Sequence, residues 1–430
     1  MSERDFFDAR TELRLIDGGA AKDTDFSVVR NRMRDGLRVN VKNVSSRPQK
    51  IKEVALYAGP ADISETTKYY GEGYHMLCQY RGTIENPQLI SQYAEDKKFF
   101  HMPENPYDKE HILTFYLLQL TNGGEHTLMG FASCHKFIGK FRFSKGYLEI
   151  IMDCEDMELA PNAAWDMEEL VVLKGKEPDA LYTRLADYIN ANHPPKKSSW
   201  GKIPTGWCSF YCVGTFSPEA IYKNAEAMAA RIPELEMIQI DAGLNIKNGD
   251  WGIWKFDDDL KTACEKVRDA GVMAGGYYSP FIVDNDSRLA AEHPDWLVRD
   301  EDNKPTNRMS YKKDWFILDG SHPEARAYLK KLIRYMYDEC GLRYFKLDFL
   351  SYGALPAGRR YDESKTAVEA YRMGMQAIWE EVGEDSFVLA CNAAFWPTLG
   401  LCHANRSTND IFRSWEKVKG NALEQFYRNW

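Results

Sequence analysis

Residues 344–350 read YFKLDFL, an apolar stretch that contains two charged residues. Its aromatic and aliphatic residues predict a short buried strand, and Gly341 lies just before it. Positions two apart in a strand point to the same face, so Lys346 and Asp348 would emerge side by side. Buried charges destabilise a fold unless they are paired. The pair therefore indicates either a functional site at the end of this strand or a structural buried ion pair.

Strand-like and helix-like segments alternate around this stretch, from residue 201 to the end of the chain. Strands are predicted over 205–210, 237–241, 272–281, 316–319, 344–350 and 386–391, with helices between them. This alternation predicts βα units and a parallel sheet. Four polar residues stand at the C-terminal ends of the strands, which form the active-site face of a (β/α)8 barrel: Asp241, Asp319, Asp348 and Asn392. Residues 208–214 contain no GxGxxG, so a TIM-type barrel is favoured over a doubly wound sheet.

The first part of the chain has a different texture. Residues 1–175 contain short β-like runs, such as 36–41, 112–117 and 147–152, separated by turn signals, and predict an antiparallel β-sandwich domain. Residues 176–200 predict a linker helix followed by a proline-rich linker, PPKKSS. Residues 201–430 form the predicted barrel domain. Only about two dozen residues follow its last strand-like segment near Arg406, so we expect either a barrel truncated at its C-terminal end or one that a second chain completes.

Composition limits the classes of partner. The 430 residues carry a net charge of −9, which argues against a nucleic-acid partner. The N-terminal MSERD is charged and no apolar run reaches transmembrane length, so we expect neither a signal peptide nor a membrane partner. Nine cysteines without a CxxC pair predict reduced thiols in a cytoplasmic protein. Homo-oligomer formation stays open.

Glycosidic chemistry would require a second carboxylate near Asp348. The best candidate is Asp410, within NRSTNDI at 405–411; two carboxyl groups about 5–5.5 Å apart serve a retaining enzyme. The alternative role for Asp410 is to cap a last helix over 415–427. Asp241 and the pair Asp250-Trp251 are candidates for sugar contact, although Asp250-Trp251 could equally anchor a loop. Further candidates for stacking on a sugar, each with a core role as the alternative, are Trp207, Trp254 and Trp396.

Ordered motifs carry a family resemblance. They are GWCSFY at 206–211, IDAG at 240–243, GDW at 249–251, HPDW at 293–296, LDGS at 318–321, the opening strand, and RSTND at 406–410. Together they resemble family 36 glycoside hydrolases, the melibiase or α-galactosidase-like group, over about residues 200–415. Residues 1–175 are similar to the β-supersandwich domain that precedes the barrel in that family.

The resemblance implies roles for individual residues. Asp348 matches the catalytic nucleophile and Asp410 the general acid/base. The matches to substrate-binding positions are Lys346, Arg406, Asp241, Asp250, Trp251, Trp207 and the segment Cys391-Asn392. The implied mechanism is double displacement with retention, and it requires no metal or organic cofactor.

One departure bears on the sugar. Relatives usually carry Asp-Asp-Gly-Trp where this chain has Asp241-Ala242-Gly243-Leu244, which weakens the implied specificity for galactose but not the glycosidase chemistry. The sequence therefore predicts a retaining α-glycosidase, most closely α-galactosidase-like. The alternatives are a transglycosidase similar to raffinose synthases and an inactive carbohydrate-binding fragment.

Overall fold

The computed structural model describes residues 6–90, 111–213, 217–252, 258–306, 314–356, 358–411 and 414–426. The chain forms two compact units. The first contains residues 1–194, 395–397 and 407–430, and the second contains residues 195–394 and 398–406. Within the described ranges, no helix combines the length and the apolar character needed to cross a membrane.

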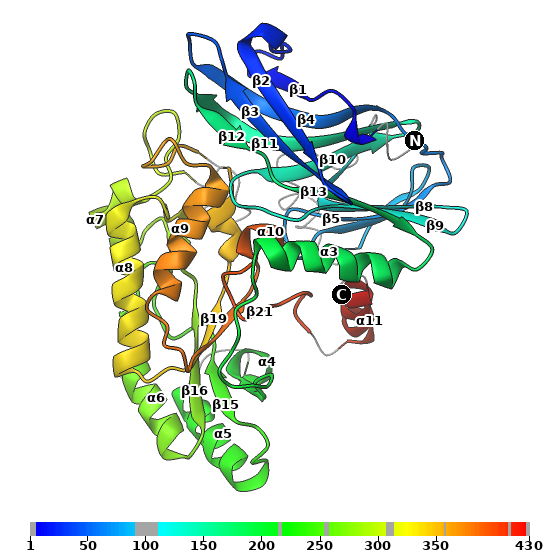
Figure 1. Ribbon diagram of the computed structural model, residues 1–430. Coiled ribbons are helices and arrows are strands. Elements are labelled where there is room, and N and C mark those ends of the chain that lie inside the picture. Colours follow the sequence, from blue (N-terminus) through cyan, green and yellow to red (C-terminus); the bar gives the residue numbers. More distant parts are fainter. Residues whose placement is uncertain are drawn as a thin grey trace. The chain divides into compact units, whose positions relative to one another are not determined.

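The first unit is a curled antiparallel sheet (Figure 1). Its main path runs β1-β4-β11-β10-β8-β9-β13-β3-β12, while β2 pairs with β3, and β5, β6 and β7 continue from β8. The strands are β1 (Glu12–Leu15), β2 (Phe26–Arg32), β3 (Gly36–Asn43), β4 (Gln49–Pro60), β5 (Lys68–Glu72), β6 (Gln79–Thr83), β7 (Pro87–Leu89), β8 (Ile112–Asn122), β9 (Glu125–Phe131), β10 (Ile138–Ser144), β11 (Tyr147–Leu159), β12 (Ala164–Asp166) and β13 (Leu170–Gly175).

Helix α3 (Pro178–Asn192) packs on the outside of this sheet, against β9 and β13. Its buried face carries Leu181, Leu185 and Ile189 at helical spacing. Gly130 on β9 leaves room for this contact, because a Cβ at that position would come 2.6 Å from Leu185 Cδ2. The segment that the sequence assigned to a linker helix is thus part of the first unit.

A short later segment also belongs to the first unit. It lies in α10 (Phe395–Thr398), where Trp396 stacks on Tyr116 with ring centroids 5.0 Å apart. The Trp396 indole Nε1 donates to the Phe131 carbonyl at 2.6 Å. With one indole face stacked, the N–H engaged and only 3% of the residue exposed, Trp396 is a core residue rather than a sugar platform.

The second unit is built on six parallel strands in the order β14-β15-β16-β19-β20-β21. They are β14 (Gly206–Cys208), β15 (Met237–Ile240), β16 (Met273–Tyr278), β19 (Tyr344–Leu347), β20 (Phe387–Ala390) and β21 (Ala404–Asn405). The order follows the sequence without the reversal that defines a doubly wound sheet. The predicted fold class, a TIM-type (β/α) barrel arrangement preceded by an antiparallel β-domain, is confirmed.

Two predicted strands differ from the structure. Residues 205–210 form strand only as far as Cys208, because α4 (Ser209–Val213) begins directly after it. The stretch predicted as a barrel strand at 316–319 contributes to β18 (Trp315–Ile317), which pairs antiparallel with β17 (Ile282–Asp284) outside the parallel sheet. A three-residue apolar run looks the same in sequence whether its partner is a core strand or a loop strand.

Asp319 is consequently not at the end of a barrel strand. It is fully buried and accepts hydrogen bonds from Ser321 N at 2.8 Å and Tyr361 N at 2.6 Å, with Arg360 Nη1 3.7 Å away. Arg360 in turn donates to the Leu355 carbonyl at 2.8 Å. Asp319 therefore joins two loops of the second unit and holds the loop that follows β19.

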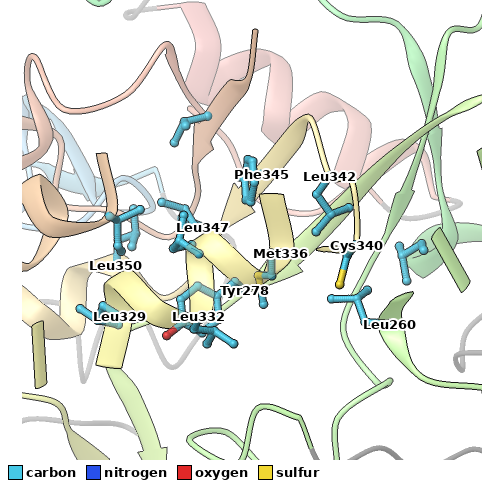
Figure 2. Close-up of a cluster of buried hydrophobic side chains, with 14 of the residues drawn as sticks. Leu260, Tyr278, Leu329, Leu332, Met336, Cys340, Leu342, Phe345, Leu347 and Leu350 are labelled. Atoms are coloured by element: carbon cyan, nitrogen blue, oxygen red, sulfur yellow. The ribbon is translucent and has the colours of Figure 1, made fainter. Parts of the chain in front are cut away.

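Helices cover the outer side of the parallel strands (Figure 1). They are α5 (Pro218–Arg231), α6 (Leu260–Asp269), α8 (Pro323–Arg334) and α9 (Ala367–Trp379). The short helix α7 (Arg288–Glu292) packs instead against β17. Figure 2 shows Phe345 and Leu347 of β19 in one cluster with Leu329 and Leu332 of α8. This apolar face of β19 supplies the hydrophobic contact that holds the helices on the sheet.

Helix α8 begins with an unusual N-cap, the side chain of His322. Its Nδ1 accepts from Glu324 N at 3.2 Å and Ala325 N at 3.5 Å, while Pro323 occupies the first helical position. Burial lowers the pKa of His322 below its ordinary value and outweighs the opposing effect of Asp295, Asp319 and Glu324. A neutral imidazole is the form that can accept these hydrogen bonds.

The cap predicts acid-sensitive stability. A histidine with a lowered folded-state pKa stabilises the fold above its unfolded pKa, and this contribution is lost as the pH falls through the folded value. Replacing His322→Asn keeps a capping group without a titrating ring, so the variant should lose less unfolding free energy between about pH 7 and about pH 5, by about 1 kcal/mol. Urea denaturation of both proteins at the two pH values measures this difference. Equal losses in the two proteins would exclude the cap as the source.

Candidate active site at the carboxyl edge of the parallel sheet

Four parallel strands deliver the predicted site residues to one edge of the sheet. Asp241 follows β15, Asp348 follows β19, Cys391-Asn392 follow β20 and Arg406 follows β21. The C-terminal ends of parallel strands lie on the same side, which is where barrel enzymes carry their active sites.

The period-two alternation of β19 separates its apolar and charged residues. Phe345 and Leu347 face the helices, as Figure 2 shows. Tyr344 lies instead in a separate cluster with Met237 of β15 and Phe387 of β20. Lys346, two residues after Tyr344, therefore points to the inner face, one level nearer the edge.

Lys346 lies between two buried carboxylates. Its Nζ is 2.9 Å from Asp241 Oδ2 and 3.5 Å from Asp348 Oδ2, and none of the three side chains is more than 8% exposed. The Tyr277 ring of β16 lies beneath the ammonium, 5.5 Å from Nζ. Burial lowers the pKa of Lys346, but Asp348, Cys391 and Asp241 outweigh it, so the pKa is raised well above its ordinary value. The ammonium thus neutralises one of two charges in the cluster.

Asp241 is occupied by groups of the protein. Its Oδ2 receives Lys346, the amide of Gln239, and the Cys208 thiol at 3.5 Å. Its Oδ1 accepts from Ala242 N at 2.8 Å. These contacts make Asp241 the counter-ion of Lys346.

Asp348 is held by two amide donors on one oxygen. Oδ1 accepts from Phe349 N at 2.8 Å and from Asn392 Nδ2 at 2.6 Å, while the Asp348 N–H donates to the Tyr278 carbonyl at 2.8 Å. Phe349 and Asn392 both adopt positive φ, +52° and +43°. Left-handed backbone at a bulky residue such as Phe349 is strained, and such strain clusters at functional sites.

Cys391 and Arg406 lie next to this carboxylate. The Cys391 thiol is fully buried, and burial together with the Asp348 charge raises its pKa. Arg406 Nη1 lies 3.6 Å from the Cys391 sulfur, and the Arg406 N–H donates to the Ala390 carbonyl at 2.9 Å. The second unit therefore brings together Asp241, Lys346, Asp348, Cys391, Asn392 and Arg406.

Asp410 belongs to the first unit and is half-buried. Its neighbour Asn409 donates from its backbone N to Glu424 Oε2 at 2.8 Å, and the Glu424 carbonyl accepts from Gln79 Nε2 at 3.1 Å. Ser414 precedes helix α11 (Trp415–Phe426) and its Oγ accepts from Lys417 N at 3.3 Å, so Ser414 and not Asp410 occupies the N-cap position. The pairing of Asp410 with Asp348 stays a prediction.

Asp250 anchors a loop. Its two oxygens accept from Arg288 N at 3.0 Å and Leu289 N at 3.1 Å, at the start of α7. Trp251 packs edge-on against Tyr278 with ring centroids 4.8 Å apart. This is the anchoring alternative that the sequence left open. Trp207 is half-buried against the main core of the second unit, and Trp254 lies outside the described residues.

Gln239 and Cys208 also belong to the cluster around Asp241, although neither was predicted as a site residue. Gln239 Nε2 donates to Asp241 Oδ2 and lies 3.3 Å from the Cys208 sulfur, and burial beside Asp241 raises the pKa of Cys208 to about 12. The signal for Gln239 was present, because it stands two residues before Asp241 on the same strand and so faces the same side. Among the residues with described positions, no group of three or more His, Cys, Asp or Glu side chains could hold a metal ion.

Residues 242–388 match the protein-family model described as Melibiase. The matched range contains Lys346 and Asp348 with their strand and ends before Cys391, Arg406 and Asp410. The match thus includes Asp348, the carboxylate that two amides hold and that faces Lys346.

Curated relatives match over part of the same unit. The bifunctional α-galactosidase/sucrose kinase AgaSK of Mediterraneibacter gnavus is 27% identical over 123 residues, which is 26% of this chain and 13% of that protein. The α-galactosidase AgaA of Geobacillus stearothermophilus is 23% identical over 142 residues, 31% of this chain and 18% of that protein. The matched region thus spans less than a fifth of either relative.

Solved structures share the fold. TtGalA, an α-galactosidase from Thermus thermophilus in complex with stachyose, matches with a TM-score of 0.65 at 21% identity, over 93% of this chain and 81% of that one. The galactosidase domain of AgaSK matches with a TM-score of 0.66 at 14% identity, over 99% and 66% of the two chains. At these identities the likeness concerns the fold.

The buried cluster makes a stability prediction for Lys346→Met. Removing the ammonium leaves Asp241 and Asp348 buried without their cation, so the free energy of unfolding should fall by about 3–5 kcal/mol. Urea denaturation of the two variants and the parent measures the change. Lys330→Met is the matched control, because Lys330 pairs with Glu380 at the exposed surface and its loss should cost about 1 kcal/mol or less. Equal losses in the two variants would contradict a buried, charge-coupled cluster.

Proposed function

We propose that this chain, a melibiase and α-galactosidase-like protein, is a retaining α-glycosidase of the α-galactosidase type. Asp348 is the nucleophile, and Asp410 is the general acid/base. The proposal rests chiefly on one observation: a buried carboxylate at the carboxyl edge of a parallel sheet, held on Oδ1 by two amides and facing an ammonium on Oδ2.

The chemistry that follows has two steps. Asp348 Oδ2 attacks the anomeric carbon, the bond to the leaving oxygen breaks, and Asp410 gives that oxygen its proton. The resulting glycosyl ester is then attacked by water, which loses a proton to Asp410, and Asp348 leaves as the carboxylate. Two inversions give net retention. The Lys346 ammonium lies 3.5 Å from Oδ2, the oxygen that attacks in the first step.

The proposed substrate is a terminal α-linked sugar, with galactose first. Its support is the α-galactosidase relatives and the solved α-galactosidase complexes with stachyose and raffinose. Leu244 is buried in the core of the second unit, and Ala242 has an apolar side chain. Neither side chain can accept a hydrogen bond from a sugar hydroxyl, so other α-glycosides belong in the test.

A panel of nitrophenyl α-glycosides tests the activity. The parent protein should release nitrophenol from at least one of them, and Asp348→Asn should lower kcat by a factor of about 10⁴ or more, since the covalent step loses its nucleophile. Asp302→Asn, at an exposed turn of the same unit, is the matched control and should retain full activity. Product analysis with excess sugar acceptor identifies a transglycosidase. Sugar binding by calorimetry without turnover of any glycoside would contradict the enzyme proposal.

Azide separates the roles of the two carboxylates. In Asp348→Gly, azide should attack the substrate directly and yield the β-glycosyl azide. In Asp410→Ala, azide should instead attack the glycosyl ester on Asp348 and yield the α-glycosyl azide. The anomeric coupling constant in the proton NMR spectrum of each product measures the outcome. The opposite pairing of variants and anomers would exchange the two assigned roles.

A further inference from the structure

We infer that Asn392 is a positioning residue that fixes Asp348 so that Oδ2, and not Oδ1, attacks the substrate. This inference rests on the proposed function and deepens it. The sequence resemblance placed Asn392 among sugar-binding positions, whereas the geometry directs its amide group at the nucleophile.

The two oxygens of Asp348 have unequal surroundings. Oδ1 accepts from the Phe349 N–H at 2.8 Å and from Asn392 Nδ2 at 2.6 Å. Lys346 Nζ approaches Oδ2 at 3.5 Å, longer than its 2.9 Å contact with Asp241. An oxygen with two short amide donors has its lone pairs engaged, so Oδ2 is the better nucleophile.

The backbone at Asn392 is held by its conformation and by hydrogen bonds to the carbonyls of residues 391 and 392. Its φ of +43° is a left-handed conformation that asparagine tolerates better than most residues. Its carbonyl accepts from Ser351 N at 2.9 Å, and the neighbouring Cys391 carbonyl accepts from Leu350 N at 3.4 Å. Residues 350–354 form the short helix that follows Asp348. The backbone contacts therefore join the end of β20 to the segment that carries the nucleophile.

The hydrogen bond from Asn392, which follows β20, restricts rotation of the Asp348 carboxylate, which follows β19. Turning the carboxylate about its terminal bond out of its present plane would break the 2.6 Å contact between Asn392 Nδ2 and the oxygen that it holds. A buried carboxylate held in this way cannot leave that plane without losing a hydrogen bond to a charged group. The site is thus preorganised for attack by one oxygen.

Asn392→Gly is the sharpest test. Glycine accepts the left-handed backbone without strain, so the change removes the amide and leaves the backbone contacts. The expected result is a loss of kcat/KM of roughly tenfold to a hundredfold, the value of a hydrogen bond to a charged group. The dissociation constant of the free sugar product, measured by calorimetry, should stay within about twofold, because a positioning residue does not contact the sugar.

A second variant and a control complete the test. Asn392→Asp keeps the shape but presents a carboxylate to Oδ1, so its loss of kcat/KM should equal or exceed that of the glycine variant. This variant serves also if the glycine variant fails to fold. Asn303→Gly is the matched control, since Asn303 has a φ of +65° in an exposed turn of the same unit. It should retain the parent kcat/KM.

Three outcomes overturn the inference. They are parental kcat/KM in Asn392→Gly, parental kcat/KM in Asn392→Asp, and a weakening of sugar binding that accounts for the whole loss, which would make Asn392 a substrate-binding residue. Absence of turnover in the parent protein would overturn the proposed function together with this inference. Turnover by the parent with an unaffected Asn392→Gly would overturn the inference alone.

Discussion

The second unit depends on one buried contact, the ammonium of Lys346 between the carboxylates of Asp241 and Asp348. Its three members come from β15 and β19, and the Tyr277 ring of β16 between them lies beneath the charge. A cation in this place is needed because two carboxylates cannot stay ionised side by side in a dry interior. The same contact places the Asp348 carboxylate at the end of β19 with Oδ2 toward the ammonium.

The loops around this contact restrict the conformation of Asp348. Phe349 and Asn392, which both donate to Oδ1 of its carboxylate, adopt left-handed conformations. Asp319 and Arg360, both buried, hold the loop that follows Asp348. Backbone strain and buried ion pairs persist only where surrounding packing over-determines them. The apolar face of β19 supplies that packing. The same strand thus contributes Phe345 and Leu347 to the core on one face and Lys346 to the charged cluster on the other.

Period-two alternation explains what could be predicted from the sequence. It placed Lys346 and Asp348 on one face of a strand, and the alternation of strands and helices predicted the parallel arrangement. This alternation does not reveal that residues 316–319 pair outside the parallel sheet, because a run of three apolar residues does not specify which strand it pairs with. Nor could it decide between sugar contact and anchoring for Asp250, since that choice depends on the amides of Arg288 and Leu289, distant in sequence. Gln239 was missed although the same alternation pointed to it.

The central claim is that Asp348 becomes covalently attached to the sugar. The protein is incubated with a fluorinated α-galactosyl inactivator, whose fluorine slows hydrolysis of the glycosyl ester so that the sugar stays attached. Peptide mapping by mass spectrometry then identifies the labelled residue. The account predicts one label per chain, on Asp348, with no label in Asp348→Asn. A label on any other carboxylate of the parent protein, Asp241 included, would contradict it.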